Sequence, residues 1–218
     1  MAIGERARLI TPEQMLWGYA NGIFPMAVSA SDPALHWFDP PERGVLPVGR
    51  VHVSRSMRRH LRRCDWQATL NRDFMAVVRG CADRDETWIN EPLSRLYAAL
   101  HAKGHAHSLE IRDGAGALIG GVFGLSIGGA FFGESMFSQR DNASKAALIW
   151  LSAHLAQCGF ALFDTQYPTG HLVSMGGQTI PRVEYHRRLS AAIRLDADLA
   201  ALPLPERQAL WQPSTQTS

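Results

Sequence analysis

The sequence predicts an α+β fold, and three patterns in its second half carry this prediction. Residues 108–111 alternate apolar and polar side chains, and the glycine-rich apolar runs 117–127 and 129–137 are typical of adjacent antiparallel strands. A helical stripe of apolar residues follows over 142–159, with Asn142 as the expected cap. Grouped strands followed by helices are typical of an α+β layer.

The first helix is expected over residues 11–22, where the sequence carries signals for both ends of a helix. Thr11 can cap the helix, Pro12 suits its first turn, and Gln14 completes a capping box. Gly22 can end the helix, because glycine adopts the backbone conformation that follows a last helical turn.

Shorter elements complete the expected order. Helices are expected over residues 54–63 and after Asn71. A short strand over 160–166 and a last helix from about Pro181 follow the helix over 142–159.

Composition and cysteine usage exclude several classes of protein. The chain has 218 residues, 46% of them hydrophobic, which is enough to bury a sizeable core. Its three cysteines lie far apart and form no C-x-x-C pair, which argues against a disulfide scaffold. The sequence predicts neither a signal peptide nor an apolar stretch of membrane-spanning length. We expect a cytoplasmic protein without membrane association, with a smaller lobe over residues 1–104 and a larger lobe over 105–218.

The net charge of +2 is too small to indicate binding of a polyanion over the whole surface, so any contact with nucleic acid must come from a local cluster. Between residues 50 and 63 the chain has six arginines, two histidines and no acidic residue. Arg58/Arg62 and Arg59/Arg63 repeat at four-residue spacing, which destabilises an isolated helix unless phosphates relieve the repulsion. On these residues alone, a solvated charged face is an equally good interpretation.

Two predicted strands contain polar residues that point to a site. Glu134 interrupts the apolar run 128–138, where a carboxylate without partners is costly to bury. Asp164 and Gln166 end the strand over 160–166, and a period of two places both on one face. These three residues are candidates for a functional site, although the pattern alone carries little weight. The alternative is that Glu134 pairs with a buried arginine and that Asp164 caps a turn.

Other common chemistries lack their motifs. The chain has no G-x-S-x-G elbow, no Walker loop and no H-E-x-x-H helix. His105 and His107 flank Ala106, but no second cluster of histidine or cysteine supplies further metal ligands. No metal site is therefore predicted.

Several short segments match one known family in the same order along the chain. They are Gly18–Pro25, His52–Met57, Thr87–Ile89, Gly104–Glu110, Gly133–Ser138, Asn142–Lys145 and Asp164–Gln166. On these segments the chain resembles the bacterial leucyl/phenylalanyl-tRNA–protein transferases over roughly residues 11 to 190. The resemblance implies a two-lobed enzyme without metal or organic cofactor. Its larger, C-terminal lobe would be similar to the acetyltransferase (GNAT) fold, with a mostly antiparallel sheet flanked by helices.

The resemblance also implies which residues bind the donor nucleotide. In such enzymes aromatic residues hold the 3′-terminal adenosine of the aminoacyl-tRNA, and by motif these are Tyr19, Trp88 and Tyr97. Stacking on an exposed base is worth about 1 to 3 kcal/mol. Met26 stands where the family commonly has tryptophan, and its thioether can pack on adenine without offering the same stacking plane.

The aminoacyl side chain is expected in an apolar pocket beside the Glu134 strand, with Met136 and Leu148 as lining residues. Such a pocket discriminates by only about 1 to 3 kcal/mol per methylene, so it should accept Leu, Phe and Met together. Asp164 would orient Gln166, whose amide oxygen would contact the attacking amine.

The partners that the resemblance implies are an aminoacyl-tRNA and acceptor proteins that begin with Arg or Lys, which the transfer would mark for N-degron degradation. The family's basic cluster favours the RNA-backbone interpretation of five arginines: Arg55, Arg58, Arg59, Arg62 and Arg63. A cationic acceptor side chain needs a carboxylate partner, which Glu134 or Asp164 could supply. We expect a monomer.

Two other functions fit part of the sequence. An acyl-CoA-dependent N-acetyltransferase would place its pyrophosphate loop at residues 139–144, but both glycine positions of that loop carry side chains here and Asp141 would repel the pyrophosphate. A non-catalytic RNA-binding module would explain the arginines but would leave Glu134, Asp164 and Gln166 without a purpose.

Overall fold

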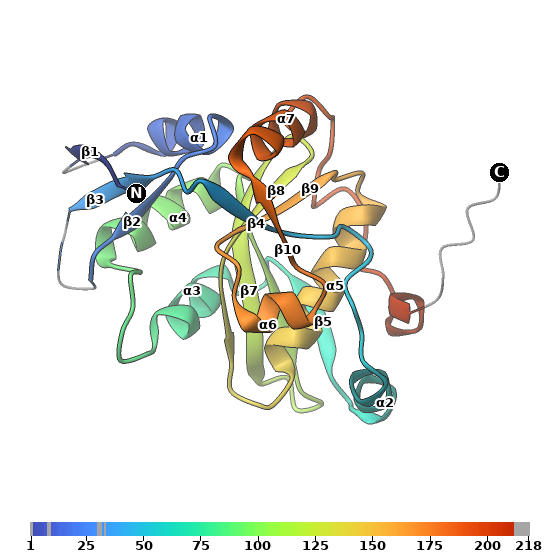
Figure 1. Ribbon diagram of the computed structural model, residues 1–218. Coiled ribbons are helices and arrows are strands. Elements are labelled where there is room, and N and C mark those ends of the chain that lie inside the picture. The colour runs from blue at the N-terminus through green and yellow to red at the C-terminus, as the bar shows by residue number, and fades with distance from the viewer. Residues whose placement is uncertain (1, 8–9, 30–31, 33, 212–218) are drawn as a thin grey trace.

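The computed structural model describes residues 2–7, 10–29, 32 and 34–211. Its helices are α1 (Pro12–Ala20), α2 (Arg55–Arg63), α3 (Phe74–Ala82), α4 (Glu91–Ala102), α5 (Ala143–Gln157), α6 (Gly170–Ser174) and α7 (Arg182–Ala192), with a 3-10 turn, η1, at Arg207–Trp211. Its strands are β1 (Ala2–Ala7), β2 (Phe24–Ala27), β3 (Leu35–Phe38), β4 (Glu42–Leu46), β5 (Gln67–Leu70), β6 (Ala106–Arg112), β7 (Leu118–Ile127), β8 (Ala130–Ser138), β9 (Leu162–Gln166) and β10 (Gln178–Pro181). Figure 1 shows their arrangement.

The strands form two sheets. The smaller sheet has the order β1-β3-β2, and the larger has the order β10-β4-β9-β8-β7-β6-β5. All neighbours in the larger sheet are antiparallel except β8 and β9, which are parallel. The predicted α+β class with a mostly antiparallel sheet is therefore confirmed. Strands β4 and β5 come from before residue 104, so the larger sheet spans both lobes expected from the sequence.

Two apolar cores lie on opposite faces of the larger sheet. Helices α1, α3 and α4 pack over one face with Phe123 and Phe132, and α2 and α5 pack over the other with Val122 and Phe131. Adjacent residues of a strand point to opposite faces, so strands buried on both sides are apolar throughout. This explains why β7 and β8 appear in the sequence as continuous apolar runs. Figure 1 shows α5 lying across the sheet.

The expected helix signals are mostly confirmed. Thr11 and Gln14 form the capping box of α1, and Ser54 caps α2 by accepting a hydrogen bond from the amide of Met57 at 3.2 Å. The start of α5 differs from the expectation. Asn142 lies in the left-handed region with φ 73° and makes no side-chain cap.

Helix α4 is not among the elements expected from the sequence, although its signals are present. Asn90 accepts a hydrogen bond from the amide of Leu93 at 2.9 Å, and a proline stands in the first turn. This helix carries Tyr97 toward the larger sheet, where the ring meets Phe123 edge-on at a centroid distance of 4.9 Å. No helix in the described residues is long and apolar enough to cross a membrane.

Candidate active site

The candidate site forms where the two parallel strands of the sheet separate. Strands β8 and β9 pair only between residues 130–132 and 162–164. Past this point no further described residues of the two strands pair, and a cavity of about 280 Å³ is lined by Glu134 on β8 and Gln166 on β9. The cavity therefore lies next to the place where the parallel pairing of β8 and β9 ends.

One part of this cavity is apolar and another is polar. The apolar lining includes Val122, Met136, Leu148, Phe163 and Leu172, and the polar lining includes Glu134, Thr165 and Gln166. The apolar part of this cavity suits a single amino-acid side chain, because pockets for whole drug-sized ligands are usually larger. Four residues predicted to bind the substrate line the cavity: Met26, Trp88, Met136 and Leu148.

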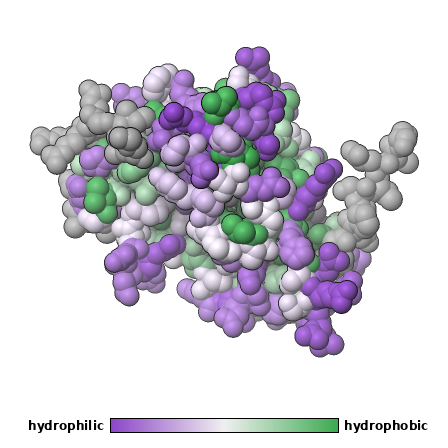
Figure 2. Space-filling view, viewed as in Figure 1, coloured by the Kyte–Doolittle hydropathy of each residue, from purple (hydrophilic) through white to green (hydrophobic). Residues whose placement is uncertain are grey.

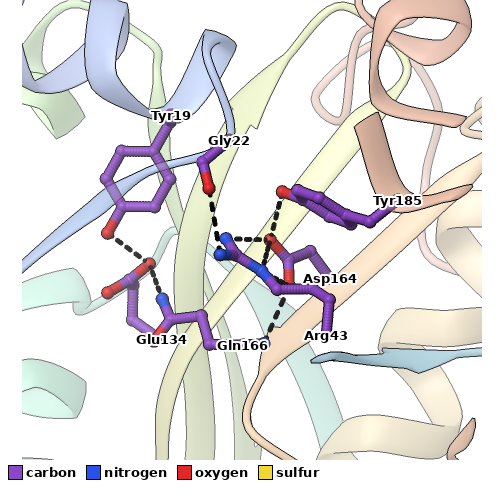
Figure 3. Close-up of polar contacts among 7 residues, drawn as sticks. All are labelled: Tyr19, Gly22, Arg43, Glu134, Asp164, Gln166 and Tyr185. Atoms are coloured by element: carbon purple, nitrogen blue, oxygen red, sulfur yellow. Dashed lines mark hydrogen bonds and ion pairs between the residues drawn. The ribbon is translucent and has the colours of Figure 1, made fainter. Parts of the chain in front are cut away.

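Glu134 is held by three hydrogen bonds, none of which comes from a cation. Its Oε1 accepts from the hydroxyl of Tyr19 at 2.7 Å and from Nε2 of Gln166 at 2.9 Å, and its Oε2 accepts from the hydroxyl of Tyr97 at 2.7 Å. Figure 3 shows Tyr19 and Gln166 converging on this carboxylate. The buried arginine that the alternative interpretation required is not a partner of Glu134.

The surroundings of Glu134 shift its acid strength toward neutrality. Burial raises the pKa of Glu134 from its ordinary value of 4.5 to about 7, while the hydrogen bonds from Tyr19, Tyr97 and Gln166 oppose this rise by stabilising the charged form. A carboxyl group with a pKa near 7 is partly ionised at neutral pH, as a general acid or base requires.

Tyr19 and Tyr97 lie in a different place from the one expected. Both side chains are 0% exposed and belong to the apolar core, and neither lines the cavity. A buried ring has no face open to a base, so direct stacking on adenine does not fit these two positions. Their hydroxyls instead fix Glu134, which corrects the role that the resemblance assigned to them.

Asp164 is paired with a buried arginine that the sequence analysis did not single out. Nε of Arg43 donates to Oδ1 of Asp164 at 3.0 Å, and Nη2 donates to Oδ2 at 2.7 Å; the two side chains are 1% and 0% exposed. Tyr185 donates its hydroxyl to Oδ2 at 2.7 Å. Nη1 of Arg43 donates to the carbonyl of Gly22 at 3.0 Å. Figure 3 shows this network beside the Glu134 cluster.

This network leaves Asp164 no access to a substrate. Its oxygens already accept bonds from Arg43, Tyr185 and the amide of Gln166, and its side chain is fully buried. Of the two carboxylates considered as partners for a cationic acceptor, only Glu134 lines the cavity.

Gln166 adopts an uncommon backbone conformation that Asp164 stabilises. Its φ is 61°, in the left-handed region that residues other than glycine rarely adopt. The amide of Tyr167 donates to the carbonyl of Thr165 at 2.7 Å, which closes a three-residue γ-turn around Gln166. The amide of Gln166 donates to Oδ1 of Asp164 at 2.8 Å. Strained turns of this kind persist where the surroundings hold them and are concentrated at functional sites.

The hydrogen bond to Glu134 sets the orientation of the Gln166 side-chain amide. A carboxylate only accepts hydrogen bonds, so the amide nitrogen of Gln166 must face Glu134. The amide oxygen accepts no hydrogen bond from the described residues and remains available beside the cavity.

The arginine-rich helix forms a second feature outside the cavity. All five predicted arginines, Arg55, Arg58, Arg59, Arg62 and Arg63, are exposed, whereas Met57 and Leu61 are buried. Figure 2 shows a strongly hydrophilic surface at the lower right, where Figure 1 places α2. The helix therefore packs through its apolar residues and presents its cations to solvent.

Comparison with known proteins identifies the family of this chain. Residues 45–190 match the family described as leucyl/phenylalanyl-tRNA protein transferase, and residues 8–41 match the N-terminal domain of the same family. The chain belongs to the leucyl/phenylalanyl-tRNA–protein transferase family. The resemblance inferred from the sequence is thus confirmed.

Relatives with this name match the transferase chain over nearly its whole length. The transferase of Paracoccus denitrificans is 66% identical, and the match covers 96% of this chain and 98% of the relative. That of Dinoroseobacter shibae is 57% identical over 92% of this chain and 89% of the relative. That of Cereibacter sphaeroides is 54% identical over 96% and 98%.

Several segments that carry the transferase resemblance meet at the site. The Gly18–Pro25 segment supplies Tyr19 and Gly22, and Thr87–Ile89 supplies Trp88. The segments Gly133–Ser138 and Asp164–Gln166 supply the two walls where β8 and β9 separate.

Proposed function

We propose that this chain transfers a leucyl or phenylalanyl group from tRNA to the N-terminal amine of an acceptor protein. The observation that carries the proposal is the cavity between β8 and β9, because it joins an apolar pocket to the polar pair of Glu134 and Gln166. An aminoacyl ester needs both: a place for its side chain and groups that orient an amine toward its carbonyl.

The donor would enter with its side chain against Met136 and Leu148, whose environment recognises size and apolarity. Trp88 and Met26 line the same cavity and are the residues proposed to pack on the terminal adenine. Tyr19 and Tyr97 contribute indirectly, by holding the carboxylate of Glu134. Leucyl, phenylalanyl and methionyl donors are all expected to fit.

The reaction forms an amide bond and breaks the ester bond between the aminoacyl carbonyl and the ribose oxygen. The amide oxygen of Gln166 would accept a hydrogen bond from the attacking amine. Glu134, with a pKa of about 7, is matched to take the proton that the amine loses, and that proton then passes to the departing ribose oxygen. Asp164 acts as a positioning residue, because it holds the Gln166 turn and does not reach the cavity.

The exposed arginines of α2 would bind the tRNA backbone. Arginine donates to phosphate in a bidentate manner, and backbone contacts carry no sequence information. This suits an enzyme that accepts tRNAs charged with different amino acids. The catalytic part over residues 105–218 would be acetyltransferase-like, and the protein would act as a cytoplasmic monomer on acceptors beginning with Arg or Lys, marking them for N-degron degradation.

The acyl-CoA alternative is disfavoured by the start of α5. The amide of Ala143 donates to the carbonyl of Arg140 at 3.0 Å, and the amide of Ser144 donates to Oγ of Ser138 at 3.1 Å. A pyrophosphate binds to free amides at a helix N-terminus. These two amides are already occupied.

The proposal is tested by offering leucyl-, phenylalanyl- and methionyl-tRNA with reporter peptides beginning Arg, Lys, Asp or Glu. We expect amide formation with the Arg and Lys reporters, measured by mass spectrometry. Coenzyme A thioesters with the same reporters are the matched comparison. Transfer from thioesters and not from any aminoacyl-tRNA would overturn the proposed function.

A further inference from the structure

One cationic side chain lines the active-site cavity in the described part of the chain, and it is Arg84. It lies in the loop that joins α3 to α4 and is exposed to solvent. Neither the aminoacyl pocket nor the Glu134–Gln166 pair explains a cation at this position.

Arg84 is held in place by neutral groups and not by a carboxylate. Its Nε donates to the carbonyl of Cys81 at 2.8 Å, and its Nη2 donates to Oγ of Ser135 at 3.0 Å and to the carbonyl of Met136 at 3.1 Å. These contacts fix the guanidinium against β8, next to the aminoacyl pocket. The Nη1 group has no hydrogen-bond partner among the described residues.

The charge of Arg84 is not cancelled by direct pairing. Asp83, Asp85 and Glu86 belong to the same exposed loop, but none forms an ion pair with Arg84 within the described structure. A guanidinium that is already oriented and keeps free donors binds an anion with little further loss of side-chain entropy.

The donor proposed above has one anionic group near its reactive end. The aminoacyl ester and the adenine are not anionic, whereas the terminal nucleotide carries a phosphate on its 5′ side. Trp88, proposed to pack on the adenine, follows Arg84 by four residues in the same loop, and both line the cavity. We propose that Arg84 binds the 5′ phosphate of the terminal adenosine while Trp88 contacts its base.

This inference rests on the proposed function and adds to it a residue that positions the donor. In this proposal Arg84 binds the 3′-terminal nucleotide, whereas the arginines of α2 bind the backbone of the rest of the tRNA. Arginine is suited to this task because its planar fork matches the geometry of a phosphate.

The test uses two stable donor analogues in which an amide links phenylalanine to the 3′ position of adenosine. One analogue carries a 5′ phosphate and the other a 5′ hydroxyl. We expect the unaltered protein to bind the phosphate-bearing analogue on the order of 10- to 100-fold more tightly, as for hydrogen bonds to a charged group. In Arg84→Gln the ratio of the two dissociation constants should fall to near one, and Arg84→Lys should keep part of it.

Arg79→Gln is the matched control, because Arg79 is an exposed arginine on α3 that does not line the cavity. It should keep the full ratio. An unaltered protein without phosphate preference, or an Arg84→Gln variant that weakens both analogues equally, would show that Arg84 only braces β8. If the unaltered protein still transferred the aminoacyl group from tRNA, the proposed function would stand without this role for Arg84. If the unaltered protein transferred no aminoacyl group, the proposed function itself would be overturned.

Discussion

Glu134 and Asp164 are two carboxylates of one candidate site with different partners, and we propose a different task for each on that ground. Asp164 is paired with the cation of Arg43 and is fully buried. Glu134 has only neutral donors, so burial raises its pKa to about 7. A group that changes its charge near neutral pH can take part in proton transfer, whereas a fully paired ion serves to hold structure.

The raised pKa of Glu134 predicts a distinct pH profile. The acceptor amine has a pKa near 8 and must be neutral to attack, and Glu134 must be ionised to take its proton. Below pH 7 both groups gain a proton, so kcat/KM should fall about 100-fold per pH unit. In Glu134→Gln the rate should be lower and should fall only about tenfold per unit, which reporter-transfer assays from pH 5.5 to 9 can measure.

Tyr97→Phe serves as the control for this profile. The substitution removes one hydrogen bond that stabilises the charged form of Glu134, so the pKa of Glu134 should rise and the acid limb should move to higher pH. An unchanged limb in both variants would mean that the profile reports the acceptor amine alone.

The structure of helix α2 fits both interpretations of its charge, a solvated face and a face that binds RNA backbone. Met57 and Leu61 pack the helix against the second core, and Ser54 caps its start, so packing sustains a helix whose like charges would oppose it in isolation. The same packing presents the arginines together on the surface. The solvated face and the proposed RNA-binding face are therefore the same face of α2.

Replacing Arg59 and Arg63 with alanine should weaken tRNA binding and lower its salt dependence. Each lost phosphate contact reduces the slope of log K against log salt by up to about one unit, so the double variant should lose up to about two. The loss should be the same for leucyl- and phenylalanyl-tRNA, because backbone contacts read no sequence. Filter-binding assays between 50 and 200 mM salt provide the measurement.

The matched control replaces Arg187 and Arg194, which lie in and just after α7, at the opposite end of the molecule from α2 in Figure 1. This pair removes the same charge. Equal loss of slope in both double variants would indicate a general effect of net charge and would contradict a specific role for α2.

At the scale of the whole molecule, the sequence predicted what local patterns determine. Capping signals placed α1, and apolar runs placed β7 and β8, because these signals act over a few residues. The two carboxylates of the candidate site stood out because a charge inside an apolar strand is costly. Motif similarity, in contrast, placed Tyr19 and Tyr97 against the terminal adenine, whereas their rings are buried and do not line the cavity.

Long-range pairing was not visible in the sequence. Arg43 follows a proline-rich segment with no apolar run, and its partner Asp164 is 121 residues away, so neither residue indicates the other. No local pattern distinguishes a buried arginine from an exposed one. The same limit hid the pairing of β4 with β9 and β10, which brings residues from before position 104 into the larger sheet.

Arg43 connects β4, β9, α7 and the segment after α1. Its replacement therefore tests how much this one side chain contributes to the stability of the fold around the site. It lies on β4 and contacts Asp164 on β9 and Gly22 after α1. Its Cζ also lies 4.4 Å from the centroid of the Tyr185 ring on α7. Arg43→Met would leave a buried charge unpaired and should cost about 3 to 5 kcal/mol of unfolding free energy, measured in urea. The exposed pair of Arg182 with Asp39 is the control, and Arg182→Met should cost less than about 1 kcal/mol.

The double variant Arg43→Met/Asp164→Leu separates stability from function. It removes both charges, so it should recover part of the stability lost in Arg43→Met, since an apolar pair of similar volume often replaces a buried ion pair without loss. Transfer should remain at least about tenfold below the unaltered rate, because the amide of Gln166 loses the acceptor that holds its turn, and a misplaced catalytic group can cost about 100-fold. Recovery of both stability and transfer would show that the Asp164 carboxylate is dispensable for positioning Gln166.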